Sequence, residues 1–110
     1  MSNKVNTHFG VQKLAVDLSA NSTAVYAGPC ILVGMVCAND ISAHDVLVLD
    51  GAATVAGAAA SSPAGTSIDC FDMPIDTSLT VDPNDSATGI LTVMFIPDHE
   101  GLAGSGAGLP

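Results

Sequence analysis

The sequence VLVLDGAATV, residues 46–55, carries the sharpest local structural signal of the chain. Val and Leu fill its first half, Thr54 and Val55 end its second half, and Asp50-Gly51 stands between them. An Asp-Gly pair between two strand-like runs is a strong signal for a β-hairpin with a two-residue turn. We therefore predict a hairpin here, with Asp50 and Gly51 at the two positive-φ positions of a type I′ turn.

Apolar residues recur with a period of two along most of the chain, as they do in β-strands. In VQKLAVDL (11–18), Leu14, Val16 and Leu18 share one face, whereas CILVGMVCA (30–38) is apolar on both faces, as a central or interface strand would be. No stretch of ten residues combines helical periodicity with capping residues. The pattern predicts an all-β protein: an antiparallel β-sandwich, jelly-roll-like, of about eight short strands.

The two ends differ in composition from the middle. We predict an N-terminal arm at residues 1–10, a β-sandwich domain at 11–97, and a C-terminal Gly/Ala-rich tail at 98–110 with the sequence DHEGLAGSGAGLP. Segments of this composition bury too little surface to fold alone, so we expect both extended arms to lie against a neighbouring chain. The interface residues predicted there are Lys4, Phe9, His99 and Leu102.

The charge of the chain is strongly negative. The sequence contains ten Asp and one Glu but only two Lys, Lys4 and Lys13, and no Arg, so its net charge is -9. Two cations neutralise few phosphates, so we expect no nucleic-acid partner and no anionic membrane partner. The sequence contains no run of 18 consecutive apolar residues, so it predicts no membrane-spanning helix. Its first ten residues, MSNKVNTHFG, lack the apolar stretch of a signal peptide.

Three groups of residues are candidate chemical sites. Cys30, Cys37 and Cys70 have no metal-ligand spacing, and we interpret them as buried thiols of a reducing compartment. DPNDS (82–86) offers too few oxygen ligands for calcium and is typical of a turn. His44 and Asp45 are neighbours on an extended chain and point to opposite faces, so they form no dyad. We predict no catalytic residue, no metal site and no cofactor.

Two long stretches resemble small all-β virion proteins of tailed bacteriophages. They are GPCILVGMVCANDISAHDVLVLDGAATV (28–55) and TSIDCFDMPIDTSLTVDPNDSATGILTVMFIP (66–97), with SAHDVLVLDG and DTSLTVDPNDSATG as their recurring elements. The resemblance is to capsid decoration (cement) proteins, and its motifs are structural rather than catalytic.

The resemblance implies a structural, non-enzymatic virion protein that binds the major capsid protein. It implies a place on the capsid surface, assembly in the host bacterial cytoplasm, and a homo-oligomer, for which we expect a trimer. Two other classes remain open: a fibre, spike or head-tail component of the same particle, or a small β-sandwich module that binds a ligand. A cupin-type enzyme is the weakest alternative, because its set of metal-binding histidines is absent.

Overall fold

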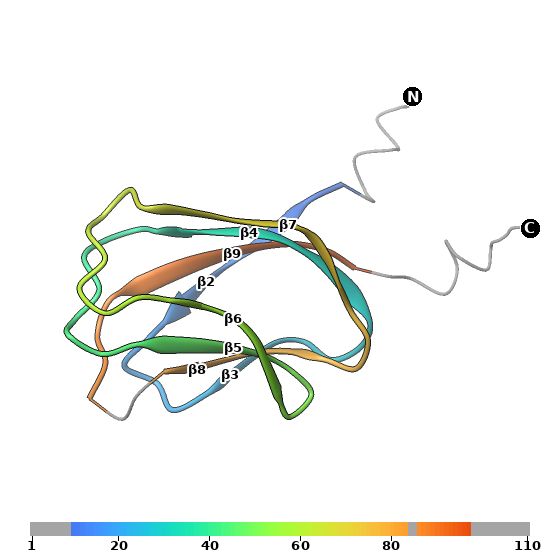
Figure 1. Cartoon of the computed structure of the whole chain (residues 1–110), viewed down its shortest axis with the longest axis horizontal. Coiled ribbons are helices and arrows are strands. Elements are labelled where there is room, and N and C mark those ends of the chain that lie inside the picture. The colour runs from blue at the N-terminus through green and yellow to red at the C-terminus, as the bar shows by residue number, and fades with distance from the viewer. Residues whose placement is uncertain (1–9, 84–85, 98–110) are drawn as a thin grey trace, which may run out of the picture.

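The computed structural model describes residues 10–83 and 86–97, and these contain strands and turns but no helix. Consequently, this part of the chain holds no helix that could cross a membrane. The strands are β2 (Gln12–Asp17), β3 (Thr23–Tyr26), β4 (Cys30–Cys37), β5 (Val46–Asp50), β6 (Ala53–Ala58), β7 (Ser67–Ile75), β8 (Leu79–Pro83) and β9 (Ile90–Pro97). The eight strands lie in two antiparallel sheets, which confirms the predicted β-sandwich (Figure 1).

The strand pairing is nested around the β5–β6 hairpin. β5 pairs with β6, β4 with β7, β3 with β8, and β2 with β9, each time antiparallel. Successive pairs alternate between the two sheets, whose orders are β2-β9-β4-β7 and β3-β8-β5-β6. The chain thus forms one long hairpin that is folded over, so that its successive strand pairs lie alternately in two sheets of four strands. This is the jelly-roll arrangement. The VLVLDGAATV stretch is the tip of that hairpin.

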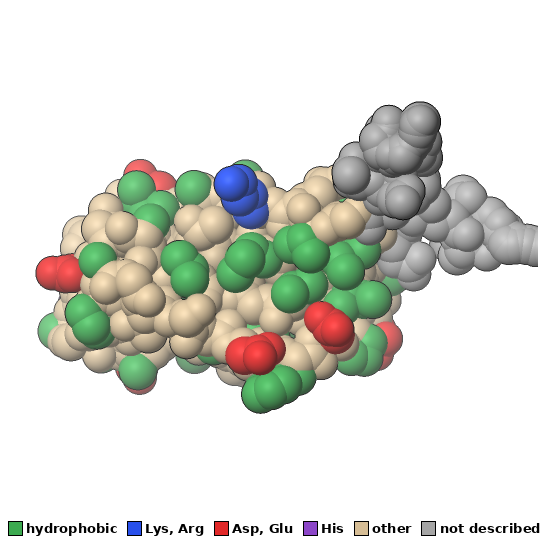
Figure 2. All heavy atoms as spheres, turned by 90° about the horizontal axis from the view of Figure 1, so that it is seen from above, with side chains coloured by type: hydrophobic (Ala, Val, Ile, Leu, Met, Phe, Trp, Pro, Cys, Tyr) green, Lys and Arg blue, Asp and Glu red, His purple; other side chains and the backbone are tan. Residues whose placement is uncertain are grey.

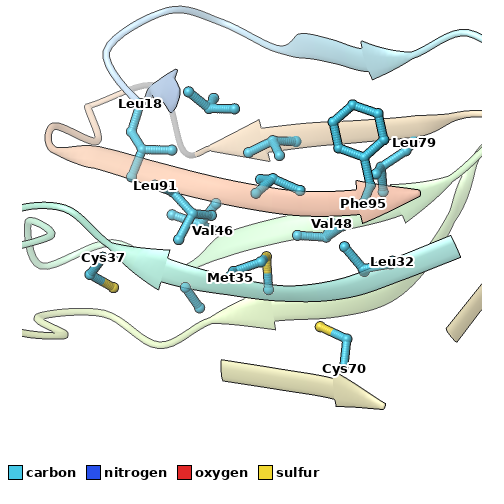
Figure 3. Close-up of a cluster of buried hydrophobic side chains, with 14 of the residues drawn as sticks. Leu18, Leu32, Met35, Cys37, Val46, Val48, Cys70, Leu79, Leu91 and Phe95 are labelled. Carbon is cyan, nitrogen blue, oxygen red and sulfur yellow. The ribbon is translucent and has the colours of Figure 1, made fainter. Parts of the chain in front are cut away.

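The core fills the space between the two sheets. Alternation puts one face of each strand inside, and the buried side chains come from both sheets and from the loops beside them. Figure 3 shows ten of them turned toward one another: Leu18, Leu32, Met35, Cys37, Val46, Val48, Cys70, Leu79, Leu91 and Phe95. Tyr26 packs on Phe95 with ring centroids 5.8 Å apart, which joins the two layers near one end. β4 lies between β9 and β7, so it is the central strand that its sequence predicts.

The predicted hairpin is confirmed, but the predicted type I′ turn is wrong. Asp50 pairs with Ala53 as part of the strands, so the two turn residues are Gly51 and Ala52. Of these, only Gly51 has positive φ, at 62°, which is the pattern of a type II′ turn with glycine first. The Asp50 carboxylate accepts hydrogen bonds from the backbone N–H groups of Asp76 and Thr77, both at 2.9 Å, which keeps Asp50 in the strand.

The excess of Asp over Glu has a structural explanation. Short carboxylates accept hydrogen bonds from nearby backbone N–H groups and so hold turns in place. Five do so here: Asp17 to Ser19, Asp40 to Ala64, Asp45 to Ala60, Asp50 to Asp76 and Thr77, and Asp69 to Phe71. Hydrogen bonds from the Ser19 hydroxyl and then the Ser19 N–H lower the pKa of Asp17, and hydrogen bonds from the N–H groups of Asp76, Thr77 and Ser78 lower the pKa of Asp50. Much of the negative charge therefore stabilises loops.

Candidate interaction surface

The most unusual surface of the described residues is the outward side of the sheet β2-β9-β4-β7, called the outer face below. Along β9, Leu91, Val93 and Phe95 point into the core, so the alternating Ile90, Thr92, Met94 and Ile96 point out. On β4, Ile31 and Val36 also point out. Neither of these two central strands carries a charged residue. The outer face is thus apolar at its centre and is covered by no described strand.

The space-filling view shows the same feature from outside. Figure 2 looks down on the outer face, where hydrophobic side chains gather over β4 and β9, with one Lys or Arg side chain near the upper edge and Asp or Glu side chains around the rim, including two on the lower side. On the opposite sheet, the central strand β8 points Thr80 and Asp82 outward, while its neighbour β5 points Leu47 outward. The outward apolar side chains of β4 and β9 are half-buried and form a contiguous area. An apolar area of this kind with a polar rim is characteristic of a protein–protein interface.

A second unusual feature is the β-bulge that presents Phe71. Phe71 and Asp72 lie in β7 with φ of 55° and 52°, a left-handed conformation that is costly for residues with side chains. The Asp69 carboxylate accepts the Phe71 N–H at 2.8 Å and so supports the bulge. The Phe71 side chain is 82% exposed. The sequence shows this place only as a break in the alternation of SIDCFDMPI.

The bulge also limits what β7 can pair with. β7 is an edge strand of its sheet, and the pairing register shifts between Leu32 and Gly34 of its neighbour β4. Bulges on edge strands twist the free backbone groups away and prevent another strand from adding to the sheet. We therefore expect partners to contact this side of the molecule through the outer face and Phe71, rather than by extending the sheet at the bulge.

An apolar hollow of about 440 Å³ lies at the end of the sheet where β9 ends. It is lined by Pro29, Cys30, Ile31, Pro74, Ile75, Asp76, Ile96 and Pro97. Ile31, Pro74 and Ile96 are register partners across three strands, so the hollow is continuous with the outer face. The predicted C-terminal tail begins at the residue after Pro97.

A wider hollow of about 660 Å³ lies beside the other sheet and includes His44, Asp45 and Asp82. The polar groups around it hold loops together. Asp45 accepts the Ala60 N–H at 3.0 Å, and the Ser42 hydroxyl accepts the Thr88 N–H at 2.9 Å. The described residues contain no cluster of three His, Cys, Asp or Glu side chains that could hold a metal ion. The prediction that His44 and Asp45 lie on an extended chain and point to opposite faces is wrong, because residues 43 and 44 form a bend and both side chains line this hollow.

The three cysteines are buried thiols, as the sequence predicts, and none is part of a disulfide. Burial raises the pKa of the Cys37 thiol, and burial together with the Asp69 charge raises the pKa of Cys70. A raised pKa reduces the thiolate fraction, which is the nucleophilic form. These two cysteines are thus core residues.

The interface residues predicted from sequence, Lys4, Phe9, His99 and Leu102, lie outside the described residues, as do the predicted arms apart from Gly10. Asn84 and Asp85 of the DPNDS turn also lie outside them, while Asp82 belongs to β8. The outer face follows from the two-sided apolar pattern of residues 30–38. The exposure of Phe71 and the arrangement of charges at the edges of the face could not be predicted, because both depend on the strand register.

Comparison of the chain with models of protein families, with curated proteins and with solved structures gives no match. The surfaces described above are therefore the basis for a functional proposal, beside the resemblance of the sequence.

Proposed function

We propose that the chain is a structural protein of a tailed-bacteriophage particle that decorates the capsid and stabilises it by binding the major capsid protein. The resemblance of residues 28–55 and 66–97 to capsid decoration proteins supports this function. The single structural observation that favours a protein acting by contact is Phe71, which is 82% exposed on a strained bulge.

Phe71 has the properties of an interface anchor. A phenylalanine in the left-handed conformation and an exposed aromatic ring both lower the stability of the folded chain. Strained residues of this kind cluster at functional sites, where the strain is part of the function. Buried aromatic side chains supply much of the binding energy at protein interfaces. Phe71 is far more exposed than the other large hydrophobic side chains of the described residues, the next being Val11 at 54%. We therefore assign Phe71 a contact with the shell.

The jelly-roll body and the acidic charge fit the same role. A sandwich built from antiparallel pairs, from β2–β9 to β5–β6, has a close-packed interior of low compressibility, so it is a stiff body that deforms little under load. The net charge of -9 keeps neighbouring copies on a particle apart and soluble. In this proposal Lys4, Phe9, His99 and Leu102 of the arms add contacts to neighbours, and neither nucleic acid nor membrane is a partner. The protein assembles in the bacterial cytoplasm, where its three thiols stay reduced.

The proposal is tested by adding the purified protein to shells that lack it. Occupancy and resistance of the shell to heat are measured for the wild type, for Phe71→Ala, and for the matched control Leu47→Ala. Leu47 is also a large exposed hydrophobic residue, 41% exposed, but it lies on the other sheet.

We expect Phe71→Ala to lower the affinity for the shell by about 2 kcal/mol, roughly thirtyfold, as at an interface hot spot. We expect Leu47→Ala to bind as the wild type does. If the wild type leaves the shell bare, the decoration function is wrong. If it is found instead in a few copies at a vertex or on the tail, the protein is a fibre, spike or head-tail component.

A further inference from the structure

The register of the sheet β2-β9-β4-β7 places two opposite charges level with each other at its two edges. Lys13 on β2 pairs with Met94 on β9, Met94 pairs with Gly34 on β4, and Gly34 pairs with Asp69 on β7. All four lie in one row across the outer face. With strands about 4.8 Å apart, Lys13 and Asp69 are separated by roughly 14 Å, with the row's midpoint between β9 and β4.

The middle of that row is uncharged. Met94 of β9 is half-buried and lies beside Gly34 of β4, which is buried and packs closely against β7: an added Cβ at Gly34 would be 2.8 Å from the Ile68 carbonyl oxygen. The half-buried Ile31 and Val36 of β4 and Ile96 of β9 continue the apolar surface along the strands. An apolar centre with charges at its rim is the composition of a protein interface.

We propose that the outer face binds the outer face of a second copy of this chain, about a two-fold axis that runs along the strands between β9 and β4. This rotation turns the face over and exchanges its edges, so that β2 lies over β7 of the second copy. Lys13 then lies over Asp69 of the second copy, and the symmetry forms this ion pair twice. In the middle, Met94 lies over Gly34 of the second copy, again twice.

The charges select this axis over the other two-fold axis that brings the faces together. A two-fold axis across the strands would lay each edge over the same edge of the second copy. The negative edge, where the exposed Asp72 stands close to Asp69, would then face itself. Like charges that face each other cost free energy, whereas the axis along the strands pairs opposite charges.

A second copy is the occupant that the charge distribution of the whole molecule favours. Each chain carries a net charge of -9, so two copies repel over most of their surface. Many of the carboxylates stand in turns or at strand ends, as Asp40, Asp45 and Asp50 do. The outer face has an uncharged centre. Its β2 edge carries Lys13, the one Lys or Arg among the described residues, and Asp17 four residues further along the same strand. Packed sheets stack about 10 Å apart with strands within about 30°, a spacing that a lysine and an aspartate side chain can span together.

The proposal predicts a dimer, because a two-fold contact between identical faces is closed and adds no third copy. This differs from the trimer expected from the sequence, so the mass of the isolated protein distinguishes the two. The proposal does not depend on the decoration function, since it concerns the purified chain. If the wild-type chain forms the dimer but does not bind the shell, only the decoration function is contradicted.

The first experiment measures the mass of the full chain by sedimentation velocity across a micromolar concentration series. We expect a dimer of twice 10.9 kDa for the wild type. Met94→Glu puts a carboxylate in the middle of the face and should weaken the dimer by at least roughly a hundredfold, because an unpaired charge would be buried. The matched control is Thr80→Glu, at an outward, half-buried position of the central strand β8 in the other sheet, which should leave the dimer unchanged.

The second experiment tests the paired charges directly. Lys13→Glu alone places carboxylates against Asp69 twice, and Asp69→Lys alone places two cations against Lys13. Each variant by itself should dimerise roughly tenfold more weakly than the wild type. A mixture of the two variants restores an opposite-charge pair at both edges and should form a heterodimer of nearly wild-type affinity.

A merely structural role of either residue predicts no such rescue on mixing. Circular dichroism of each variant establishes that it is folded, and if Asp69→Lys is not, Met94→Glu against Thr80→Glu decides alone. A trimeric wild type, or equal dimerisation of Met94→Glu and Thr80→Glu, would overturn the proposal. So would a monomeric wild type, which would leave the face to another occupant such as residues 98–110 of the same chain or the shell itself.

Discussion

The carboxylate of Asp50 accepts a hydrogen bond from the backbone N–H of Thr77 at 2.9 Å, across 27 positions of the chain. Asp50 stands at the tip of the β5–β6 hairpin, whereas Thr77 lies in the short connection between β7 and β8. The bond thus ties the innermost pair of the nested strands to the chain that passes between the two sheets. A second bond, from the Asp76 N–H to the other carboxylate oxygen, reinforces it.

Asp50→Ala should therefore lower the midpoint of thermal unfolding. The substitution removes the acceptor of two backbone N–H groups and also frees the turn to shift by one residue. Asp76→Ala, which removes a carboxylate from the same connection without removing an acceptor of these bonds, is the control. Equal midpoints for Asp50→Ala and Asp76→Ala would show that the Asp50 bonds do not hold the tip of the hairpin.

The same carboxylate predicts how stability depends on acid. Hydrogen bonds from Asp76 and Thr77 lower the pKa of Asp50 in the folded state below its unfolded value of about 4. The stability that the charged form contributes is complete above the unfolded pKa and is lost as the pH falls through the lower, folded pKa. Between neutral pH and pH 2, Asp50→Asn should lose less stability than the wild type. Parallel curves of unfolding free energy against pH would contradict this.

The backbone conformation at Gly51, in the turn of the β5–β6 hairpin, favours glycine over other residues. Its φ of 62° disfavours a β-branched residue, and an added Cβ would meet the Thr77 side chain at 3.4 Å. We expect Gly51→Val to lower the free energy of unfolding by about 1 kcal/mol or more. Gly51→Asn, a residue that tolerates positive φ, should cost less. Urea denaturation measures both, and an equal loss for Val and Asn would mean that backbone strain is not the cause.

Phe71 predicts an opposite relation between stability and binding. Phe71→Gly relieves a left-handed phenylalanine, so the free energy of unfolding should stay level or rise, by up to about 1 kcal/mol. The same substitution removes the proposed anchor, so binding to the shell should fall as far as it does in Phe71→Ala. A variant that is less stable by more than that amount would indicate that the ring supports the fold rather than a contact.

The local sequence pattern was sufficient to predict the class of fold. The exposure of single residues and the exact position of the turn depend on the pairing of strands that are distant in sequence. Alternation at Leu14, Val16 and Leu18 predicts a strand with one inward face, although Leu14, near the edge, remains 37% exposed. The Asp50-Gly51 pair predicts the hairpin, but the hydrogen bonds to Asp50 come from residues far along the chain and move the turn by one position.

One part of the candidate interaction surface could be predicted from the sequence and another part could not. The two-sided apolar run of residues 30–38 predicts a central strand, and its outward side became part of the outer face. The row from Lys13 to Asp69 depends on three separate pairings between strands that are distant in sequence. Nothing local to either residue indicates that they are level with each other. The left-handed conformation of Phe71 likewise arises from the extra residues that β7 carries opposite β4.

Electron cryo-microscopy maps of intact particles are the measurement that would locate this chain on a capsid shell and so test the proposed decoration function. We expect jelly-roll density repeated on the lattice of the shell, in hundreds of copies, with the Phe71 bulge of β7 against the major capsid protein. Particles whose shell carries no such density, or copies attached with Phe71 facing solvent, would contradict it.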